Sequence, residues 1–177
     1  MFGFLSRRRR DDERKAEALY HQIVQQARKP EFYIAGGVPD TVAGRFDLIA
    51  LHAFLAMRQL KATKQQGAGI AQALFDVMFA DMDRNLREMG VGDLGVGRRV
   101  KAMAKGFYGR VHAYEVALGS DAPGALTEAL SRNLYAGETV EPAKLAVMAD
   151  YLRREAKAGE GRMDALEARL QFGLPPG

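Results

Sequence analysis

Apolar residues recur at helical spacing along most of the chain, most clearly between Phe75 and Arg110. Two amphipathic stretches there flank a run of glycines that begins at Gly90 and ends at Gly97. Glycines stop a helix and allow the chain to reverse tightly. The pattern therefore predicts two helices that pack against each other as a hairpin, with the rest of the chain covering them.

The remaining apolar periodicity predicts further helices and no strand. A helix is expected from about Thr41 to Thr63. It is apolar on nearly every side between Leu48 and Met57, which is typical of a helix at the centre of a bundle. Gly67 and Gly69 predict a break before the hairpin, whose first helix is expected to begin near Ile70. Other apolar stripes lie in Ala16–Ala27, Leu126–Leu134, Leu145–Leu152 and Met163–Leu170.

We therefore expect an all-α, single-domain bundle of six to seven helices, built around the central apolar helix and the helical hairpin. The helical domain is expected to span residues 14–172, between a basic, flexible segment at 1–13 and a short tail at 173–177. The connection 29–40 is apolar for a loop and is expected to pack on the core.

Capping residues set the expected helix boundaries. Asp11 or Asp12 is the expected N-cap of the first helix, and Asp40 or Thr41 that of the central helix. Pro142 is expected to open the helix that follows the Leu126–Leu134 stripe.

Composition narrows the class of protein. The chain has 177 residues, of which 47% are hydrophobic and 27% charged, so it can bury a core and is not expected to be disordered. It has no cysteine, which excludes disulfides, a thiol nucleophile and cysteine-ligated metals. The formal net charge of +4 is modest, and the excess is concentrated in Arg7–Arg10.

The N-terminus has its apolar and basic parts in the wrong order for a secretory signal. It has two interpretations: a solvated end of the chain, or a weak contact with an anionic membrane surface. The contact residues of the second interpretation would be Phe2, Phe4, Leu5, Arg7, Arg8, Arg9 and Arg10.

Three motifs suggest chemistry without establishing it. Gly90-Val91-Gly92-Asp93-Leu94-Gly95 has the spacing of a dinucleotide-binding loop, but a helix and not a strand is predicted before it. Asp76 and Asp83 share a helical face and suggest a magnesium–diphosphate site, although ion pairing with nearby arginines is the simpler explanation. The three histidines lie on separate predicted helices, and His52 is expected to be a buried, hydrogen-bonded residue. We expect no metal, no cofactor and no catalytic residues.

The segment Phe107-Tyr108-Gly109-Arg110 is unusual for a helix interior. Gly106 and Gly109 are three residues apart and would leave a bare strip, which favours close packing of another helix of this chain over a partner site. Tyr108, Arg110 and Tyr114 are residue types that often anchor interfaces.

Three segments carry a resemblance to a known family: Phe32–Leu60, Asp81–Gly97 and the FYGR sequence. They resemble the ubiquinol–cytochrome c chaperone family, most closely over about Leu19–Leu118. The resemblance implies an all-helical, non-catalytic factor that assists assembly of the respiratory ubiquinol–cytochrome c reductase by binding cytochrome b or an assembly intermediate. A helper protein is a further candidate partner. The chain resembles a bacterial member, in the cytoplasm and peripheral to the inner face of the cytoplasmic membrane.

Mixed charge around apolar anchors suits a transient partner interface. The expected partner-binding residues are Asp81, Asp83, Arg84, Arg87, Asp93, Tyr108, Arg110 and Tyr114. Two alternatives stay open: an all-α enzyme or small-molecule binder that uses Asp76 and Asp83 for a metal–diphosphate ligand, and a nucleic-acid binder that uses only Arg7–Arg10. Nucleic acid is not an expected partner.

Overall fold

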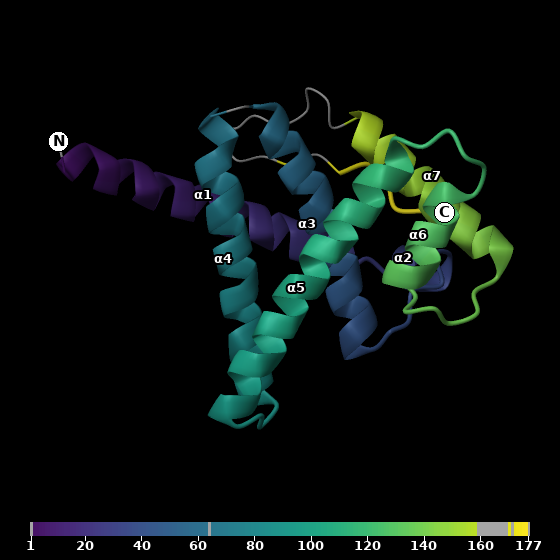
Figure 1. The fold of residues 1–177 in the computed structure, drawn as a ribbon, viewed down its shortest axis with the longest axis horizontal. Helices are drawn as coiled ribbons and strands as arrows, with labels where there is room; N and C mark the ends of the chain where they lie inside the picture. The colour runs from purple at the N-terminus through teal and green to yellow at the C-terminus, as the bar shows by residue number, and fades with distance from the viewer. Residues whose placement is uncertain (1, 64, 159–169, 171, 177) are drawn as a thin grey trace.

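The computed structural model describes residues 2–63, 65–158, 170 and 172–176. Within these residues the chain forms seven helices and no strand, so the predicted all-α bundle is confirmed. Figure 1 shows the helices crossing one another, with α1 extending beyond the others at the N-terminal side. The helices are α1 (Phe2–Ala27), α2 (Glu31–Ile34), α3 (Val42–Ala62), α4 (Gln65–Glu88), α5 (Asp93–Leu118), α6 (Ala125–Asn133) and α7 (Pro142–Ala158).

The first helix begins at Phe2, so the prediction that Asp11 or Asp12 caps it is wrong. Asp11 instead lies within the helix and pairs with Arg14 at 2.6 Å and with Lys15 at 2.7 Å. Such pairs at three- and four-residue spacing support a helix through a charged sequence. Residues 2–13 of the basic segment therefore share the helix of the domain, and the flexibility of the segment stays a prediction.

The connection between α1 and α3 packs on the core through a single-turn helix. Phe32 of α2 and Val38 after it are buried. Thr41 caps α3 as predicted, since its side chain accepts a hydrogen bond from the Gly44 amide at 3.0 Å. The apolar character of this connection therefore reflects core packing.

The central position of α3 is confirmed by its burial on most sides. Its residues enter both hydrophobic clusters of the molecule: Leu51 and Phe54 lie in the cluster with α6 and α7, whereas Ala53 and Leu60 lie in the cluster with α1 and α4. The helix thus joins two halves of the core.

The predicted break at Gly67 and Gly69 is wrong, because α4 runs through both residues. These glycines serve close approach instead. A Cβ at Gly67 would lie 2.0 Å from the Leu60 carbonyl oxygen, and one at Gly69 would lie 2.3 Å from a carboxylate oxygen of Asp12 on α1. Side-chain-free positions thus bring α4 against α3 and α1.

The glycine-rich segment forms the hairpin turn. Gly90 has a φ of +80° and Gly92 caps α5. A helix precedes the turn, so the strand required for a dinucleotide-binding loop is absent from this described segment. Figure 1 shows α4 and α5 meeting at the turn, at one end of the molecule, and diverging away from it.

The C-terminal helices close the second half of the core. Pro142 opens α7 as predicted, and α6 follows Gly124, which has a φ of +83°. Residues 172–176 lie back on the bundle, where the Gly173 amide donates to Glu155 at 2.8 Å. The last predicted helix falls on Met163 and Leu166, which lie outside the described residues.

Candidate partner-binding surface

The turn end of α4 carries an exposed network of charges. Arg87 donates to Asp83 at 2.6 Å and also pairs with Asp93 at the start of α5. Asp83 and then Asp93 raise the pKa of Arg87 through these hydrogen bonds. The structure therefore brings together three of the predicted partner-binding residues, and their charges face solvent.

Asp81 also has a structural role, in addition to its predicted role in partner binding. Its carboxylate accepts a hydrogen bond from the Tyr20 hydroxyl of α1 at 2.8 Å, and further bonds from Arg84 at 3.3 Å and Asn85 at 3.2 Å. Burial and the neighbouring carboxylate raise the pKa of Tyr20. Asp81 thus joins α4 to α1, while Arg84 extends into solvent.

Tyr108 is the exposed aromatic residue of the predicted set, with 58% of its surface accessible. Its ring stacks on that of Phe75 on α4, with 5.2 Å between centroids. Phe75 lies 13 residues before the end of α4, about 20 Å along the helix. Tyr108 is therefore held in place, but well away from the charges at the turn.

Arg110 points into the molecule. It donates to Asp47 of α3 at 2.5 Å and to the Asn133 carbonyl oxygen of α6 at 3.2 Å, and its guanidinium lies over the Phe46 ring. Burial raises the pKa of Asp47 to about 6, although Arg110 opposes that rise. The role predicted for Arg110 as a partner anchor is therefore corrected: it binds three helices of this chain together.

Tyr114 is fully buried, which corrects its predicted place on the partner surface. Its ring packs 5.5 Å from that of Phe54, and burial raises the pKa of its hydroxyl. A side chain without accessible surface cannot contact a partner of the folded protein. Replacing Arg110 and Tyr114 would therefore test the stability of the bundle and not partner binding.

The strip at Gly106 and Gly109 packs against none of the helices α1–α7, contrary to the favoured expectation, as far as the described residues show. A Cβ at Gly109 would meet no atom within 4 Å, and one at Gly106 would meet only the Arg110 guanidinium, at 2.9 Å. This side of α5 is open.

His52 belongs to a buried polar chain, as predicted. Burial lowers its pKa to about 4, so the ring is neutral near neutral pH. One ring nitrogen lies 2.8 Å from the Leu48 carbonyl oxygen and the other 2.9 Å from the Tyr151 hydroxyl. Because a carbonyl only accepts, Nδ1 carries the proton and Nε2 accepts from Tyr151, which in turn accepts from Gln26 at 3.1 Å. The hydrogen bonds of His52, Tyr151 and Gln26 are therefore made within the fold, and they position no side chain at the surface.

The two aspartates of the metal–diphosphate hypothesis have different neighbours. Asp76 accepts from Gln72 at 3.0 Å, whereas Asp83 pairs with Arg87. Among the described residues no group of three or more histidine or carboxylate side chains is placed to hold a metal ion. The hypothesis stays a prediction without a converging set of ligands.

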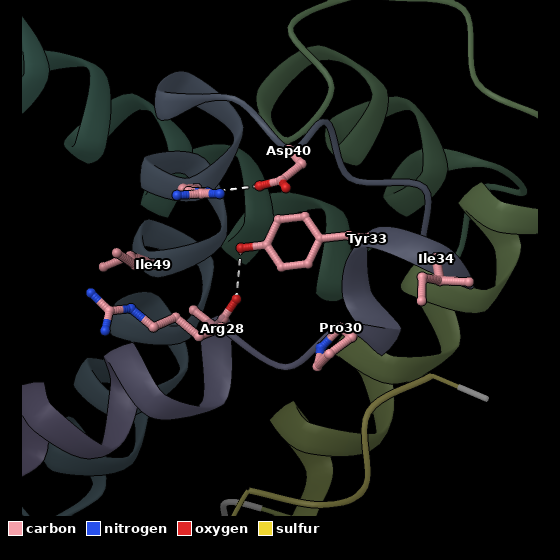
Figure 2. Close-up of a pocket in the computed structure, with 8 residues that line it drawn as sticks. Arg28, Pro30, Tyr33, Ile34, Asp40 and Ile49 are labelled. Carbon is pink, nitrogen blue, oxygen red and sulfur yellow. Dashed lines mark hydrogen bonds and ion pairs between the residues drawn. The ribbon is translucent and has the colours of Figure 1, made fainter.

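A half-open pocket of about 550 Å³ lies where the end of α1, α2 and the start of α3 meet. Figure 2 shows Tyr33 projecting across it, and its hydroxyl donates to the Ala27 carbonyl at 2.8 Å. Arg45 pairs with Asp40 at 2.7 Å on one side, and Arg28 lines another. The sequence indicated that this connection packs on the core, but no signal in it predicted a hollow.

The arginines near the N-terminus lie on the exposed part of α1. Arg7 and Arg10 are exposed, and Arg9 pairs with Glu13 at 2.9 Å. The side chains of Phe2, Phe4 and Leu5 lie outside the described residues. No helix in the described part of the chain is long and apolar enough to cross a bilayer.

Comparison with known proteins identifies the family. The family model described as ubiquinol-cytochrome C chaperone matches residues 35–161. Ubiquinol-cytochrome c reductase complex assembly factor 1 is 24% identical to the chain in mouse and in Xenopus laevis; the alignments cover 77% and 78% of this chain, and 46% and 69% of the relatives. The chain thus spans about half the length of the mouse relative.

A solved structure agrees over nearly the whole chain. The crystal structure of the Cbp3 homolog from Brucella abortus superposes with a TM-score of 0.78 and 36% sequence identity, covering 95% of this chain and 93% of that one. The match to the family model extends over more than half of the residues, from before α3 into the residues after α7. The chain belongs to the ubiquinol–cytochrome c chaperone family.

Proposed function

We propose that this protein is an assembly factor for the respiratory ubiquinol–cytochrome c reductase. It acts by binding cytochrome b, or an assembly intermediate that contains it, and not by catalysis. The observation that carries the proposal is family membership over residues 35–161, together with relatives that are named as assembly factors of this complex.

The partner surface of the proposal is the outer side of the α4–α5 hairpin. It consists of the charged residues at the turn and Tyr108 as an apolar anchor. Exposed ion pairs contribute little to stability, so these residues can exchange partners at small cost to the fold. An aromatic ring held in place by stacking also loses little conformational freedom on binding. The site that we carry forward comprises Asp81, Asp83, Arg84, Arg87, Asp93 and Tyr108.

The proposed place of action is the inner face of a bacterial cytoplasmic membrane, where an apolar membrane protein such as cytochrome b is inserted. Arg7 and Arg10 are exposed, which supports a weak contact of the N-terminal helix with anionic lipid. A bound client would be shielded there until its cofactors and partner subunits are in place.

The test is crosslinking and affinity capture from native-host membranes, with mass spectrometry of the bound proteins. The wild-type chain should enrich cytochrome b, most strongly in cells blocked in reductase assembly. The combined variant Arg84→Ala, Arg87→Ala, Tyr108→Ala should lower that enrichment about tenfold, as expected when interface anchors are lost.

A matched variant separates the surface from the function. Lys144→Ala, Arg153→Ala, Val42→Ala removes two cations whose side chains are 37% and 55% exposed, together with one exposed apolar side chain. All three lie away from the hairpin, so this variant should leave capture unchanged. Equal loss in both variants would reject the hairpin surface but keep the function. Failure of the wild-type chain to capture any reductase subunit would reject the function.

A further inference from the structure

We infer that the outer side of α5 is a docking surface for an anionic phospholipid bilayer. The surface, here called the basic stripe, combines exposed apolar residues with cations that have no ion-pair partner among the residues that the structure describes. It is separate in sequence from the N-terminal arginines. The basic stripe consists of Leu94, Arg98, Lys101, Lys105, Tyr108 and Val116.

The helical repeat places these residues on one straight line. At 100° per residue, all six lie within about 40° of the direction of Leu94, over a length of about 33 Å. All six are exposed. The buried residues Val96, Phe107 and Tyr114 point to the opposite side of α5. The stripe therefore forms a straight, outward-facing edge that a flat surface can touch along its whole length.

The exposed cations of α5 differ from those of the other long helices. On α1, α4 and α7, cations pair with carboxylates three or four residues away, for example Arg9 with Glu13, Arg87 with Asp83 and Arg153 with Asp150. The three cations of the stripe, and Arg99 beside it, form no ion pair with any residue that the structure describes.

No carboxylate is available on the stripe to neutralise these cations. The two carboxylates of α5 are both engaged by arginines of other helices: Asp93 with Arg87 of α4, and Glu115 with Arg58 of α3. His112, the other ionisable residue in line with the stripe, is exposed. An ordinary solvated helix face mixes both signs of charge, whereas this face offers one sign to whatever it meets.

The apolar members favour lipid over a purely polar anionic partner. Leu94 is 96% exposed at the start of α5, and Val116 is 58% exposed near its end. Tyr108 lies between them, where an amphipathic ring suits the boundary between headgroups and water. A protruding leucine beside cations has the chemistry of a surface-inserted side chain, with attraction to anionic headgroups holding it there.

The turn gives Leu94 room to reach a bilayer. A Cβ at Gly92 or at Gly97 would meet no atom within 4 Å, so both flanks of Leu94 are open. Figure 1 places this turn at an extremity of the molecule. No other helix of the described structure shields it.

The basic stripe shares Tyr108 with the proposed client surface, but it is tested separately from the assembly function, because binding to lipid can be measured without a client. The probe is sedimentation of the full chain with vesicles of equal parts phosphatidylglycerol and phosphatidylcholine, against vesicles of phosphatidylcholine alone. We expect binding only to the anionic vesicles, and weakening of that binding by salt.

The stripe variant is Arg98→Gln, Lys101→Gln, Lys105→Gln. Each cation near an anionic surface contributes a factor of roughly five to the partition coefficient, so binding should fall at least tenfold. The matched control Lys61→Gln, Arg132→Gln, Lys157→Gln removes the same charge from exposed positions on other helices, and should fall less than threefold on the same scale. The comparison is repeated with Arg7–Arg10 replaced by glutamine, where the stripe should account for most of the remaining binding.

A positional label tests insertion directly, because the chain has no tryptophan. Leu94→Trp should give a blue shift of its emission on anionic vesicles. Ile34→Trp, at another exposed apolar position outside the stripe (74% exposed), should give none.

Three results would overturn the inference. One is a wild-type chain that does not bind anionic vesicles. Another is equal loss of binding in the stripe and control variants, which would mean that the net charge of the protein and not the stripe determines binding. The third is unchanged vesicle binding by the stripe variant together with loss of binding to an acidic protein or to RNA, which would assign the surface to that partner instead.

Discussion

Two groups of charges in this protein have similar chemistry and opposite surroundings. Asp47 and Arg110 join α3 to α5 with side chains that are 6% and 22% exposed. Arg87, Asp83 and Asp93 join α4 to α5 at the turn with side chains that are 36–87% exposed. Each group connects α5 to another helix through an arginine and an aspartate.

The difference lies in what happens when one member is lost. When one residue of the turn group is removed, the charge of its partner is hydrated by solvent. When Arg110 is removed, the Asp47 carboxylate stays largely out of water. The first group can therefore serve a partner, and the second serves the fold. The predictions that follow test this contrast, from the largest effect to the smallest.

Arg110→Ala should lower the free energy of unfolding by about 3 kcal/mol or more, because it leaves the Asp47 carboxylate buried without its partner. The measurement is urea unfolding followed by circular dichroism. The double variant Asp47→Leu, Arg110→Met removes both charges and should recover much of the loss. If the double variant is as unstable as the single one, packing of the arginine and not the charge pair explains the effect.

The second prediction concerns His52, a buried polar side chain that is neutral near pH 7 and should make the stability of the fold depend on pH. The pKa of His52 is lowered to about 4 in the folded protein, so between pH 6.5 and 4 the unfolded chain binds the proton first. Stability that His52 provides at neutral pH is therefore lost as the pH falls through this range, by up to roughly 3 kcal/mol at about 1.4 kcal/mol per pKa unit.

The readout is the difference in unfolding free energy between the wild-type chain and His52→Gln, followed from pH 7 to pH 4. As the pH falls, the wild-type chain should lose stability relative to His52→Gln. The raised pKa of Asp47 acts in the opposite sense, because its folded carboxyl group takes up a proton first and gains stability as the pH falls through about 6. The subtraction removes this term. A difference that does not change with pH would mean that His52 titrates normally.

The smallest effect is expected at the turn. Arg87→Ala should change the free energy of unfolding by less than about 1 kcal/mol, because its partners are solvated. Arg84→Ala, a neighbouring cation that is 67% exposed, provides the matched control. A loss above 2 kcal/mol for Arg87→Ala alone would show that the turn network holds the hairpin closed. The exposed charges would then stabilise the fold as the pair of Asp47 and Arg110 does, contrary to the comparison above.

Local rules were sufficient for much of the fold. The Thr41 cap, the Pro142 start of α7 and the central place of α3 follow from residues a few positions apart. The start of α1 is not predictable from capping residues alone, because the ion pairs of Asp11 with Arg14 and Lys15 continue the helix past Asp11 and Asp12. Gly67 and Gly69 predict a break from local rules, because the helices that they approach, α3 and α1, lie elsewhere in the sequence.

The candidate site was harder to predict, since it depends on which side of a helix faces the core. Tyr108 and Tyr114 are the same residue type, and six positions turn the second one about 120° away from the first. Tyr114 shares its phase with Phe107, a signal that was present in the sequence. Arg110 had no such signal, because Asp47 lies 63 residues away.

The place of α3 between the two clusters of the core has a consequence for how this sequence can evolve. A substitution in α4 or α7 is accommodated within one cluster, and neighbours in that cluster can compensate for it. A substitution on α3, such as at Leu51 or Ala53, must fit the cluster on its own side of the helix without moving the side chains that pack in the other cluster. Drift should therefore be slowest along α3, and the two halves should change together and not be exchanged separately between relatives.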